Sequence, residues 1–376
     1  MKHFTKKLLA ASVSLAAATG ALAADKTPTL GEVLKASGVT VSGYIDYSYN
    51  DLSTDQGSTI YRAYDTERRG FALQMADLSV GYLPASGFGG FAELNYGSDA
   101  KVNSFFADPT TAPNNFDAQQ LYMQYASGPF ALLAGKFDTI AGYEVIQAPN
   151  DVNFSRSYLF SFLEPAFHTG LRGTYTPSDT LKFTVGVNNG WNVNKKSFKP
   201  AVGTPPNSPT GNTLELGVSA TPVKMFSIAG AYYSGQESGA TEAGTRSLLD
   251  LVATLNATDA LAFVLAYDNV KQEHGLAGGS DAKADGIAGY VNYQFTKMWR
   301  VSLRTEEFKD KDGLFSAFGS EQKLKETTLT VGYAPADSLE LRAEYRQDKS
   351  DQQPFTESGN PTDKMHSLAL EALYKF

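Results

Sequence analysis

Four arginines near the C-terminal end are spaced so that they could act together on an ion or a dipolar solute. They form two pairs, and the members of each pair lie four residues apart. In an extended strand, positions of one parity share a face, so the two pairs would form a basic wall. Facing carboxylates, such a wall would create a transverse field that orders dipolar solutes. The four residues are Arg300, Arg304, Arg342 and Arg346.

A simpler interpretation is that neighbouring glutamates neutralise these arginines. Glu306, Glu340 and Glu344 share their parity, and charges of one parity on adjacent strands commonly pair. The sequence leaves both interpretations open. Two earlier basic residues, Arg172 and Lys182, fall on the same face of their own segments and complete the predicted set of inward charges.

A long segment, residues 138–167, carries a second group of charges between two predicted strands. Rings of charged side chains in a narrow passage set ion preference, so this segment is the candidate constriction. The acidic excess of the chain weakly favours cations, although screening acts within about 8 Å at physiological salt. The candidate residues are Asp138, Glu144, Asp151, Arg156 and Glu164.

Residues that could break a covalent bond are sparse. His168, His274 and His366 are the imidazole bases beyond the N-terminal leader, and no G-x-S-x-G or H-E-x-x-H motif surrounds them. A triad assembled from separate strands would not show in the sequence, so a barrel hydrolase stays an alternative. Residues 310–313 match only a fragment of a calcium loop. We predict a turn there, and no metal or cofactor.

The elements that would position these charges are amphipathic strands. In the clearest one, Leu339, Leu341, Ala343 and Tyr345 alternate with two glutamates and two arginines. Such alternation excludes both a buried core strand and a helical period. From Leu171 onward, a unit of about 40 residues repeats as strand, tight turn, strand and long polar loop.

About sixteen strands are predicted along the chain, an even number that suits an antiparallel barrel. A phase shift near Ala76 and Asp77 predicts a bulge in the second strand. In the first half of the chain the strands are predicted at residues 39–50, 71–82, 90–97, 119–126 and 130–137.

The length of the strands favours a membrane barrel. A strand of about 9 residues tilted by about 40° covers roughly 23 Å, close to the ~25 Å apolar band of outer-membrane barrels. Hydrocarbon offers no hydrogen-bond partners, so only a sheet without edges is stable there. A secreted β-sandwich also alternates, but strictly alternating short and long connections fit it poorly. The predicted fold is therefore all-β, a transmembrane antiparallel up-and-down barrel of residues 39–376 with short periplasmic turns and long extracellular loops.

The N-terminus predicts export. A basic stretch, a short apolar run and an A-x-A motif make residues 1–23 a Sec signal peptide, cleaved between Ala23 and Ala24. Residues 24–38 would form a short periplasmic segment. Within it, residues 29–37 could be an amphipathic helix that rests at the barrel mouth or inside the lumen.

Composition narrows the class of partners. The chain has 40 acidic and 32 basic residues, which disfavours nucleic-acid binding because phosphate contacts require a basic face. It has no cysteine, so disulfides and thiolate metal sites are excluded.

The last strand, residues 368–376, has one oily and one polar face and ends on Tyr374 and Phe376. Aromatic residues are typical of the membrane–water interface of such barrels. This ending resembles the C-terminal signature of bacterial outer-membrane barrels, whose last residue is typically Phe. The resemblance implies recognition by the barrel-assembly machinery through this strand.

Several short motifs resemble the OmpL-like β-barrel porin family of Gram-negative outer membranes, over essentially the whole mature chain. The resemblance implies an outer-membrane channel in contact with lipid and lipopolysaccharide. The strand count also resembles that of general porins. In those proteins the loop at the place of residues 138–167 folds into the lumen, and homotrimers occur. The motifs are Gly38-Val-Thr-Val-Ser-Gly43-Tyr44, Gly135-Lys136-Phe137, Gly142-Tyr143-Glu144, Ser155-Arg156-Ser157, His168-Thr169-Gly170 and Asn189-Gly190-Trp191.

Side chains cannot fill a barrel of 16 to 18 strands, so an aqueous channel remains. The leading hypothesis is a porin for passive diffusion of small hydrophilic solutes and ions, with no catalytic step. The alternatives are the barrel hydrolase and an adhesin or receptor that acts through the outer loops.

Overall fold

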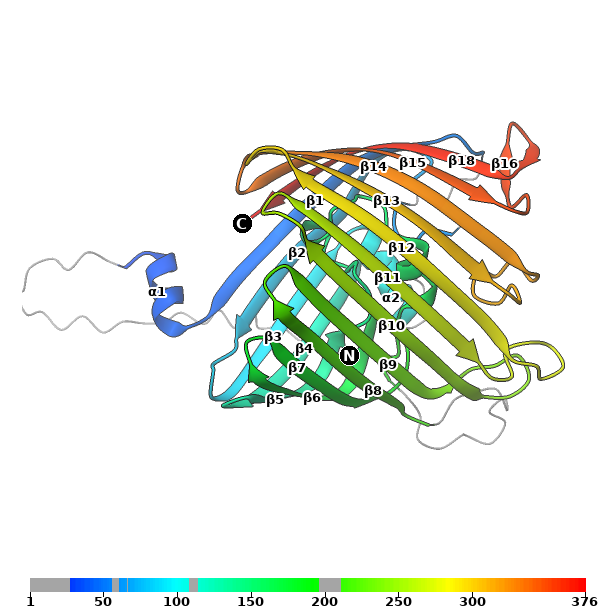
Figure 1. Cartoon of the computed structure of the whole chain (residues 1–376). Coiled ribbons are helices and arrows are strands. Elements are labelled where there is room, and N and C mark those ends of the chain that lie inside the picture. Colours follow the sequence, from blue (N-terminus) through cyan, green and yellow to red (C-terminus); the bar gives the residue numbers. More distant parts are fainter. Residues whose placement is uncertain (1–27, 56–60, 66, 108–113, 196–210) are drawn as a thin grey trace, which may run out of the picture.

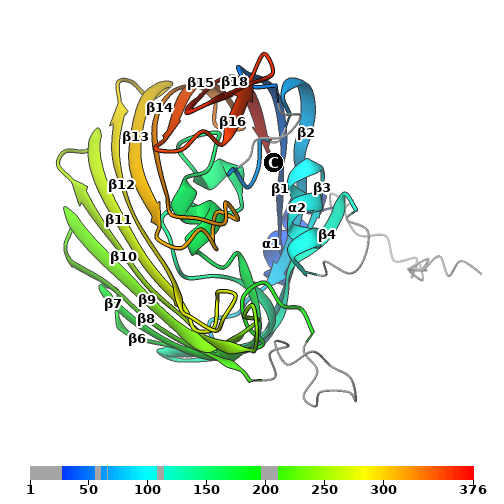
Figure 2. The ribbon, with the colours of Figure 1, turned by 90° about the vertical axis from the view of Figure 1, so that its right-hand side faces the viewer.

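Sixteen antiparallel strands close into one barrel (Figures 1 and 2). The computed structural model describes residues 28–376 except 56–60, 66, 108–113 and 196–210. The predicted signal peptide and its cleavage site at Ala23 and Ala24 lie outside the described residues. The predicted fold class is confirmed, with tight turns at one end of the barrel and long loops at the other.

The barrel wall is built from fifteen consecutive strands and the last strand of the chain. A small hairpin in the last long loop, β16 (Phe355–Glu357) with β17 (Asn360–Thr362), stands apart from it. The wall strands are β1 (Thr40–Leu52), β2 (Arg69–Tyr82), β3 (Gly87–Tyr96), β4 (Phe116–Ser127), β5 (Phe130–Asp138), β6 (Phe167–Ser178), β7 (Leu181–Asn188), β8 (Thr213–Val223), β9 (Phe226–Glu237), β10 (Gly244–Asn256), β11 (Leu261–Gln272), β12 (Ala282–Gln294), β13 (Trp299–Asp310), β14 (Gln322–Ala336), β15 (Leu339–Ser350) and β18 (Lys364–Lys375). The helical elements are α1 (Leu30–Ser37), α2 (Ser98–Ala107), the 3-10 turn η1 (Ala148–Asn150) and the π-helical turn η2 (Leu159–Leu163).

The seam of the barrel lies between β1 and β18. Gly43 and Phe376 exchange two backbone hydrogen bonds of 3.0 Å each. A Cβ atom on Gly43 would lie 2.2 Å from the carbonyl oxygen of Asp77 and 2.7 Å from the Phe376 ring. Glycine is therefore required here, because the last residue of the chain packs directly on the first strand.

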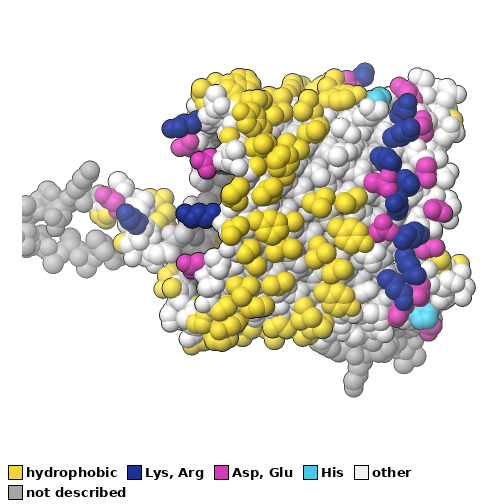
Figure 3. Space-filling model, in the orientation of Figure 1, with side chains coloured by type: hydrophobic (Ala, Val, Ile, Leu, Met, Phe, Trp, Pro, Cys, Tyr) yellow, Lys and Arg dark blue, Asp and Glu magenta, His cyan; other side chains and the backbone are white. Residues whose placement is uncertain are grey.

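The outer face of the wall is apolar, as the alternation predicts. Leu303 and Leu329 are 41% and 46% exposed although they lie in mid-strand. At the short-turn end, Trp299 stacks on Tyr333 with ring centroids 4.4 Å apart. Figure 3 shows the resulting apolar band across the wall, with charged residues along its long-loop edge. Among the described residues, no helix has the length and apolarity needed to cross a membrane.

The predicted bulge lies in the expected strand but two residues earlier than its predicted position. The register of β1 with β2 moves from Met75 to Leu73, which leaves Gln74 as the extra residue. Gln74 and Met75 are both buried, so neighbouring side chains face inward at this point. After the bulge the alternation resumes in the opposite phase, at Ala76 and Asp77. The sequence therefore shows the phase shift two residues after the bulge itself.

A short helix, α1, precedes the barrel. The Thr29 side chain accepts a hydrogen bond from Glu32 N–H and the Glu32 side chain bonds back, which forms a capping box. Gly38 ends the helix with a φ of 72°. The helix lies outside the barrel, beside the end that carries the short turns and the C-terminus (Figure 1).

The apolar core lies inside the barrel and not between two layers. Leu159 and Leu163 of η2 pack with buried residues of the wall such as Ala284, Ala288 and Phe308. A Cβ on Gly286 would lie 2.6 Å from Leu159 Cδ1, so β12 carries glycine where the helical turn approaches it most closely.

Candidate functional site

The segment between β5 and β6, residues 139–166, lies inside the barrel (Figure 2). We call it the lumen loop. It contacts β11 and β12 through η2 and β18 through η1. It also contacts the first strands, since Ile146 and Ala148 pack with Tyr44 and Met75. The loop is therefore held by both early and late strands, and its position depends on the closed wall.

The four arginines predicted as a basic wall all bind the main chain of the lumen loop. Each guanidinium donates to one or two carbonyl oxygens within residues 148–156. The contacts are Arg300 to Val152 at 2.7 Å, Arg304 to Ser155 at 2.6 Å, Arg342 to Asn153 at 3.4 Å and Ala148 at 3.2 Å, and Arg346 to Arg156 at 2.6 Å.

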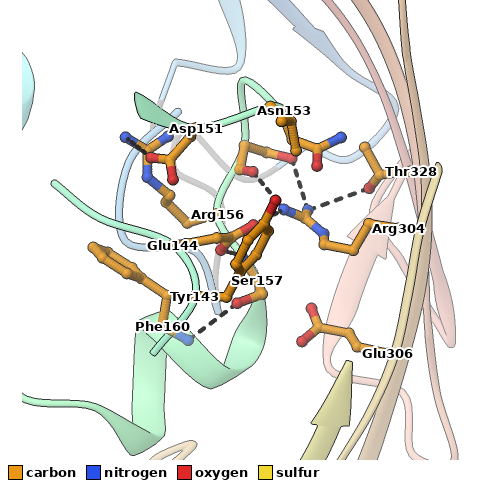
Figure 4. Close-up of polar contacts among 12 residues, drawn as sticks. Tyr143, Glu144, Asp151, Asn153, Arg156, Ser157, Phe160, Arg304, Glu306 and Thr328 are labelled. Carbon is orange, nitrogen blue, oxygen red and sulfur yellow. Dashed lines mark hydrogen bonds and ion pairs between the residues drawn. The ribbon is translucent and has the colours of Figure 1, made fainter. Parts of the chain in front are cut away.

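The same arginines are ion-paired. Arg304 lies between Glu144 of the loop, at 2.6 Å, and Glu326 of β14, at 2.7 Å (Figure 4 shows Glu144 and Arg304). The Arg304 side chain is 0% exposed. The predicted opposition of a basic wall and an acidic loop therefore takes the form of a buried ion pair. The other pairs are Arg300 with Glu340, Arg342 with Glu340 and Glu371, and Arg346 with Glu326 and Asp348.

Of the three glutamates predicted to pair with these arginines, Glu306, Glu340 and Glu344, only Glu340 forms an ion pair with them. Glu306 and Glu344 instead accept hydrogen bonds from backbone N–H groups of the lumen loop. Glu306 binds Tyr158 at 2.7 Å, and Glu344 binds Phe154 and Ser155 at 2.8 and 3.0 Å. The wall thus offers donors to the loop carbonyls and acceptors to the loop amides, which fixes the loop along its main chain.

Two of the candidate constriction residues brace the loop internally. Arg156 donates to the carbonyl oxygens of Val145, Phe154 and Ile146 and forms an ion pair with Asp151 at 3.0 Å. Asp151 also accepts a hydrogen bond from Val145 N–H. Both side chains are buried.

The surroundings of Asp151 and Glu144 shift their acidities in opposite directions. Burial raises the pKa of Asp151 to about 7, and Arg156 only partly offsets this effect. Burial also tends to raise the pKa of Glu144, but Arg304 and the Ser157 N–H outweigh it, so this pKa is lowered. Glu144 is therefore held as a carboxylate beside Arg304.

The remaining predicted charges lie around the start of the loop, at its end and on the wall. The Asp138 carboxylate accepts hydrogen bonds from Gln119 and Gln147. Arg172 pairs with Glu215 at 2.6 Å and donates to the carbonyl oxygen of Asp138. Lys182 is exposed close to a short turn. Glu164 lies beside Asp250 and Asp268 of the wall.

Sequence reasoning missed several partners in this network. Glu326 and Asp348 share the parity of inward-facing neighbours, so their orientation was readable from the alternation. Arg62 was not foreseeable, because it reaches Asp348 from the first long loop across 286 residues. The role of Tyr233 was not foreseeable either, because its hydroxyl accepts the N–H of Ile140, which is 93 residues away in the sequence. The same hydroxyl donates to Glu215.

The family described as "Putative beta-barrel porin-2, OmpL-like" matches residues 38–376, so the chain belongs to this family. The protein is therefore a channel of the outer membrane, which confirms the predicted class and location. A search of curated protein sequences gives no match.

Solved structures support the same architecture. The outer membrane channel DcaP of Acinetobacter baumannii has a TM-score of 0.63 at 15% identity, over 90% of this chain and 97% of that one. The anion-selective porin from Comamonas acidovorans has a TM-score of 0.62 at 11% identity, over 90% of this chain and 99% of that one. OprB of Pseudomonas putida has a TM-score of 0.60 at 11% identity, over 92% of this chain and 96% of that one. At these identities the likeness concerns the fold alone.

Proposed function

We propose that small hydrophilic solutes and ions diffuse through this barrel past the lumen loop, and that the charges around the loop fix its position. The observation that carries the proposal is the contact of all four wall arginines with loop carbonyls. The candidate residues Glu144, Asp151 and Arg156 then set the width of the constriction by bracing the loop. Their charges are paired, so they contribute little to ion preference.

Planar bilayers test this proposal. The purified protein should give stepwise conductance, and Arg304→Ala should raise the conductance and its noise because the loop is released. The reversal potential in a salt gradient should change little. A matched control is Arg69→Ala, which removes an exposed Arg–Asp ion pair with a side chain 69% exposed. An unchanged conductance with a shifted reversal potential would instead mean that these charges act as a filter.

We further propose that lipopolysaccharide binds outside the barrel at the long-loop end, which is extracellular. Outward-facing lysines lie opposite one another across four strands there, in the register pairs Lys309–Lys323, Lys325–Lys349 and Lys349–Lys364. Glu307 bridges Lys309, Lys323 and Lys325, but Lys349 and Lys364 have no ion pair among the described residues. Like charges in such positions are destabilising, so an anion is expected beside this last pair. Lys323, Lys325 and Lys349 also line a surface groove of about 900 Å³. We propose that phosphate groups of lipid A supply this anion and lie in the groove.

The lipid proposal can be tested by retention of lipopolysaccharide on the refolded protein. Replacement of Lys323, Lys325 and Lys349 by Gln should abolish binding, whereas Lys182→Gln with Lys224→Gln, both exposed near the short turns, should not. Dephosphorylated lipid A should bind the unaltered protein weakly. Equal binding by both variants would place the lipid elsewhere.

Two further partners follow from the fold family. The exposed aromatic rings of Tyr374 and Phe376 lie at the short-turn end of β18, where the barrel-assembly machinery could recognise them during insertion. OmpT of Vibrio cholerae, a structural neighbour with a TM-score of 0.61, has a trimer form. We propose a homotrimer here as well, and the mass of the detergent-extracted protein, corrected for bound detergent, tests it.

No observation favours the hydrolase. His168 stacks on Tyr233 with ring centroids 4.8 Å apart and is 0% exposed, so a substrate could not reach it. His366 contacts the Tyr345 hydroxyl at 2.8 Å, and His274 contacts the carbonyl oxygen of Gly279. We therefore propose a channel without catalytic activity.

A further inference from the structure

Three carboxylates meet inside the barrel where the lumen loop ends against the wall. Asp250 lies on β10 and Asp268 on β11, and the two are direct partners in the register of these strands. Glu164 approaches them from the loop. One carboxylate oxygen of each residue lies within 4.8 Å of the others.

Asp250 and Asp268 are 1% and 0% exposed, yet none of their carboxylate oxygens has a hydrogen-bond partner of ordinary geometry. The backbone of Gly142, in the lumen loop, also approaches Asp250. Within the described part of the chain, no arginine, lysine or histidine forms an ion pair with any member of the trio. By contrast, the buried carboxylates of Glu215, Glu326 and Asp348 each have an arginine partner.

A buried carboxylate without a partner costs several kcal/mol. Like charges directly opposite each other on adjacent strands add to this cost. Two such residues beside a third carboxylate are therefore expected to bind a positive group, and the residues that the structure describes do not supply one. Gly142 leaves room for this convergence, because it has a φ of 89° and a Cβ there would lie 1.9 Å from Glu164 Oε2.

We propose that Glu164, Asp250 and Asp268 bind one calcium ion between the lumen loop and the wall. The ligands are oxygens only, as Ca²⁺ prefers, and water would complete its coordination. Two oxygens on opposite sides of a calcium ion at about 2.4 Å are separated by about 4.8 Å, and the three carboxylate oxygens all lie within that distance of one another. Mg²⁺ dehydrates reluctantly and usually keeps several waters, so it suits a buried group of three carboxylates less well.

The ion would hold a part of the loop that the arginines do not reach. The arginines bind residues 148–156 from β13 and β15, whereas Glu164 lies against β10 and β11. Calcium would therefore attach the loop to a second part of the wall, so that the loop spans the lumen between two fixed points. This structural role rests on the proposed channel function, but the binding site itself does not.

Calorimetric titration with calcium tests the proposal independently of conductance. The protein is refolded in detergent without lipopolysaccharide, which itself binds divalent cations, and is freed of calcium with a chelator. We expect one calcium ion per barrel, weaker binding of magnesium, and a higher melting temperature in calcium than in chelator.

The variant Asp250→Asn with Asp268→Asn should lose both the binding and the calcium-dependent rise in melting temperature. Glu164→Gln, which alters only the loop, should lower the affinity at least tenfold. Asp285→Asn is the matched control, because Asp285 lies on the neighbouring strand β12 and pairs with Lys311 on the outer surface. Heat-shifted migration on gels verifies that each variant is folded. Absence of saturable binding by the folded unaltered protein, or equal binding by the double variant, overturns the proposal and leaves protons as the neutralising partner.

Discussion

Arg304 shows how much one side chain contributes to the interior of this barrel. Its guanidinium group contacts carboxylates of Glu144 and Glu326 and the backbone of Ser155, which come from the lumen loop and a neighbouring strand. Burial of an isolated guanidinium would be costly, and these charge-assisted hydrogen bonds compensate for it. The side chain therefore links the wall to the loop, and water has no access to it.

We expect Arg304→Ala to lower the free energy of unfolding by about 3–5 kcal/mol, because the buried Glu144 loses its ion-pair partner and Glu326 keeps only the more distant Arg346. Urea unfolding in lipid vesicles would measure this change. For Arg69→Ala, whose ion pair is exposed, the expected loss is below about 1 kcal/mol. Similar losses from both variants would show that the interior pair is not energetically distinct.

At the scale of the strand, the alternation of polar and apolar residues has two separate consequences. The outward residues meet lipid, and the inward ones bind the lumen loop. The midpoint of the outer face lies near Leu329, between the aromatic Tyr333 and the charged Lys325. Depth in the membrane can therefore be read along a single strand.

Leu329→Arg should destabilise the barrel by about 2–4 kcal/mol, because it places a charge near the centre of the bilayer. Met225→Arg, in a short turn where the side chain is 52% exposed, should cost only about 0–1 kcal/mol, as expected at the interface. Folding yields in vesicles compare the two variants. If both cost the same, the depth assignment of the outer face is wrong.

The strands were predictable because their signal is local. Tyr345 and Arg346 are adjacent, and their opposite environments follow from parity alone. The contacts of the lumen loop are not local. Arg346 and Asp348 could be assigned to the inner face, but the sequence holds no sign that Arg346 binds the carbonyl oxygen of Arg156 or that Asp348 binds Arg62. Such pairings depend on the closed barrel.

The carboxylate trio was predictable only in part, because its members lie on predictable strands but meet through non-local contacts. The sequence led us to predict no metal site, because the one partial calcium motif, near Asp310, is incomplete. Asp250 and Asp268 face each other only through the register of β10 and β11, and Glu164 joins them only through the path of the lumen loop. No linear spacing identifies a site of this kind.

At the scale of the whole molecule, the barrel depends on the closeness of its first and last strands. Gly43 leaves space for the Phe376 ring and for the backbone of β2. A side chain at this position would separate β1 from β18 and leave two unpaired edges in the membrane, where unsatisfied backbone groups cost several kcal/mol each.

Gly43→Val should therefore strongly reduce the folded fraction, measured as the heat-modifiable band on gels. Gly289→Val is the matched control, since a Cβ at Gly289 on β12 would have no atom within 4 Å. It should fold like the unaltered protein. Normal folding of Gly43→Val would show that the seam tolerates a wider separation.

The lumen loop is made long before the strands that hold it. Glu144 and Arg304 are separated by 160 residues, and Phe154 and Glu344 by 190. Until β13 and β15 have been inserted, the loop lacks the four wall arginines and the two glutamates, Glu306 and Glu344, that bind its main chain, so we expect it to take its final position only in the last steps of assembly. We therefore expect a nascent barrel to have a wider interior than the mature one, and the loop to narrow the passage only after the last strands have been inserted.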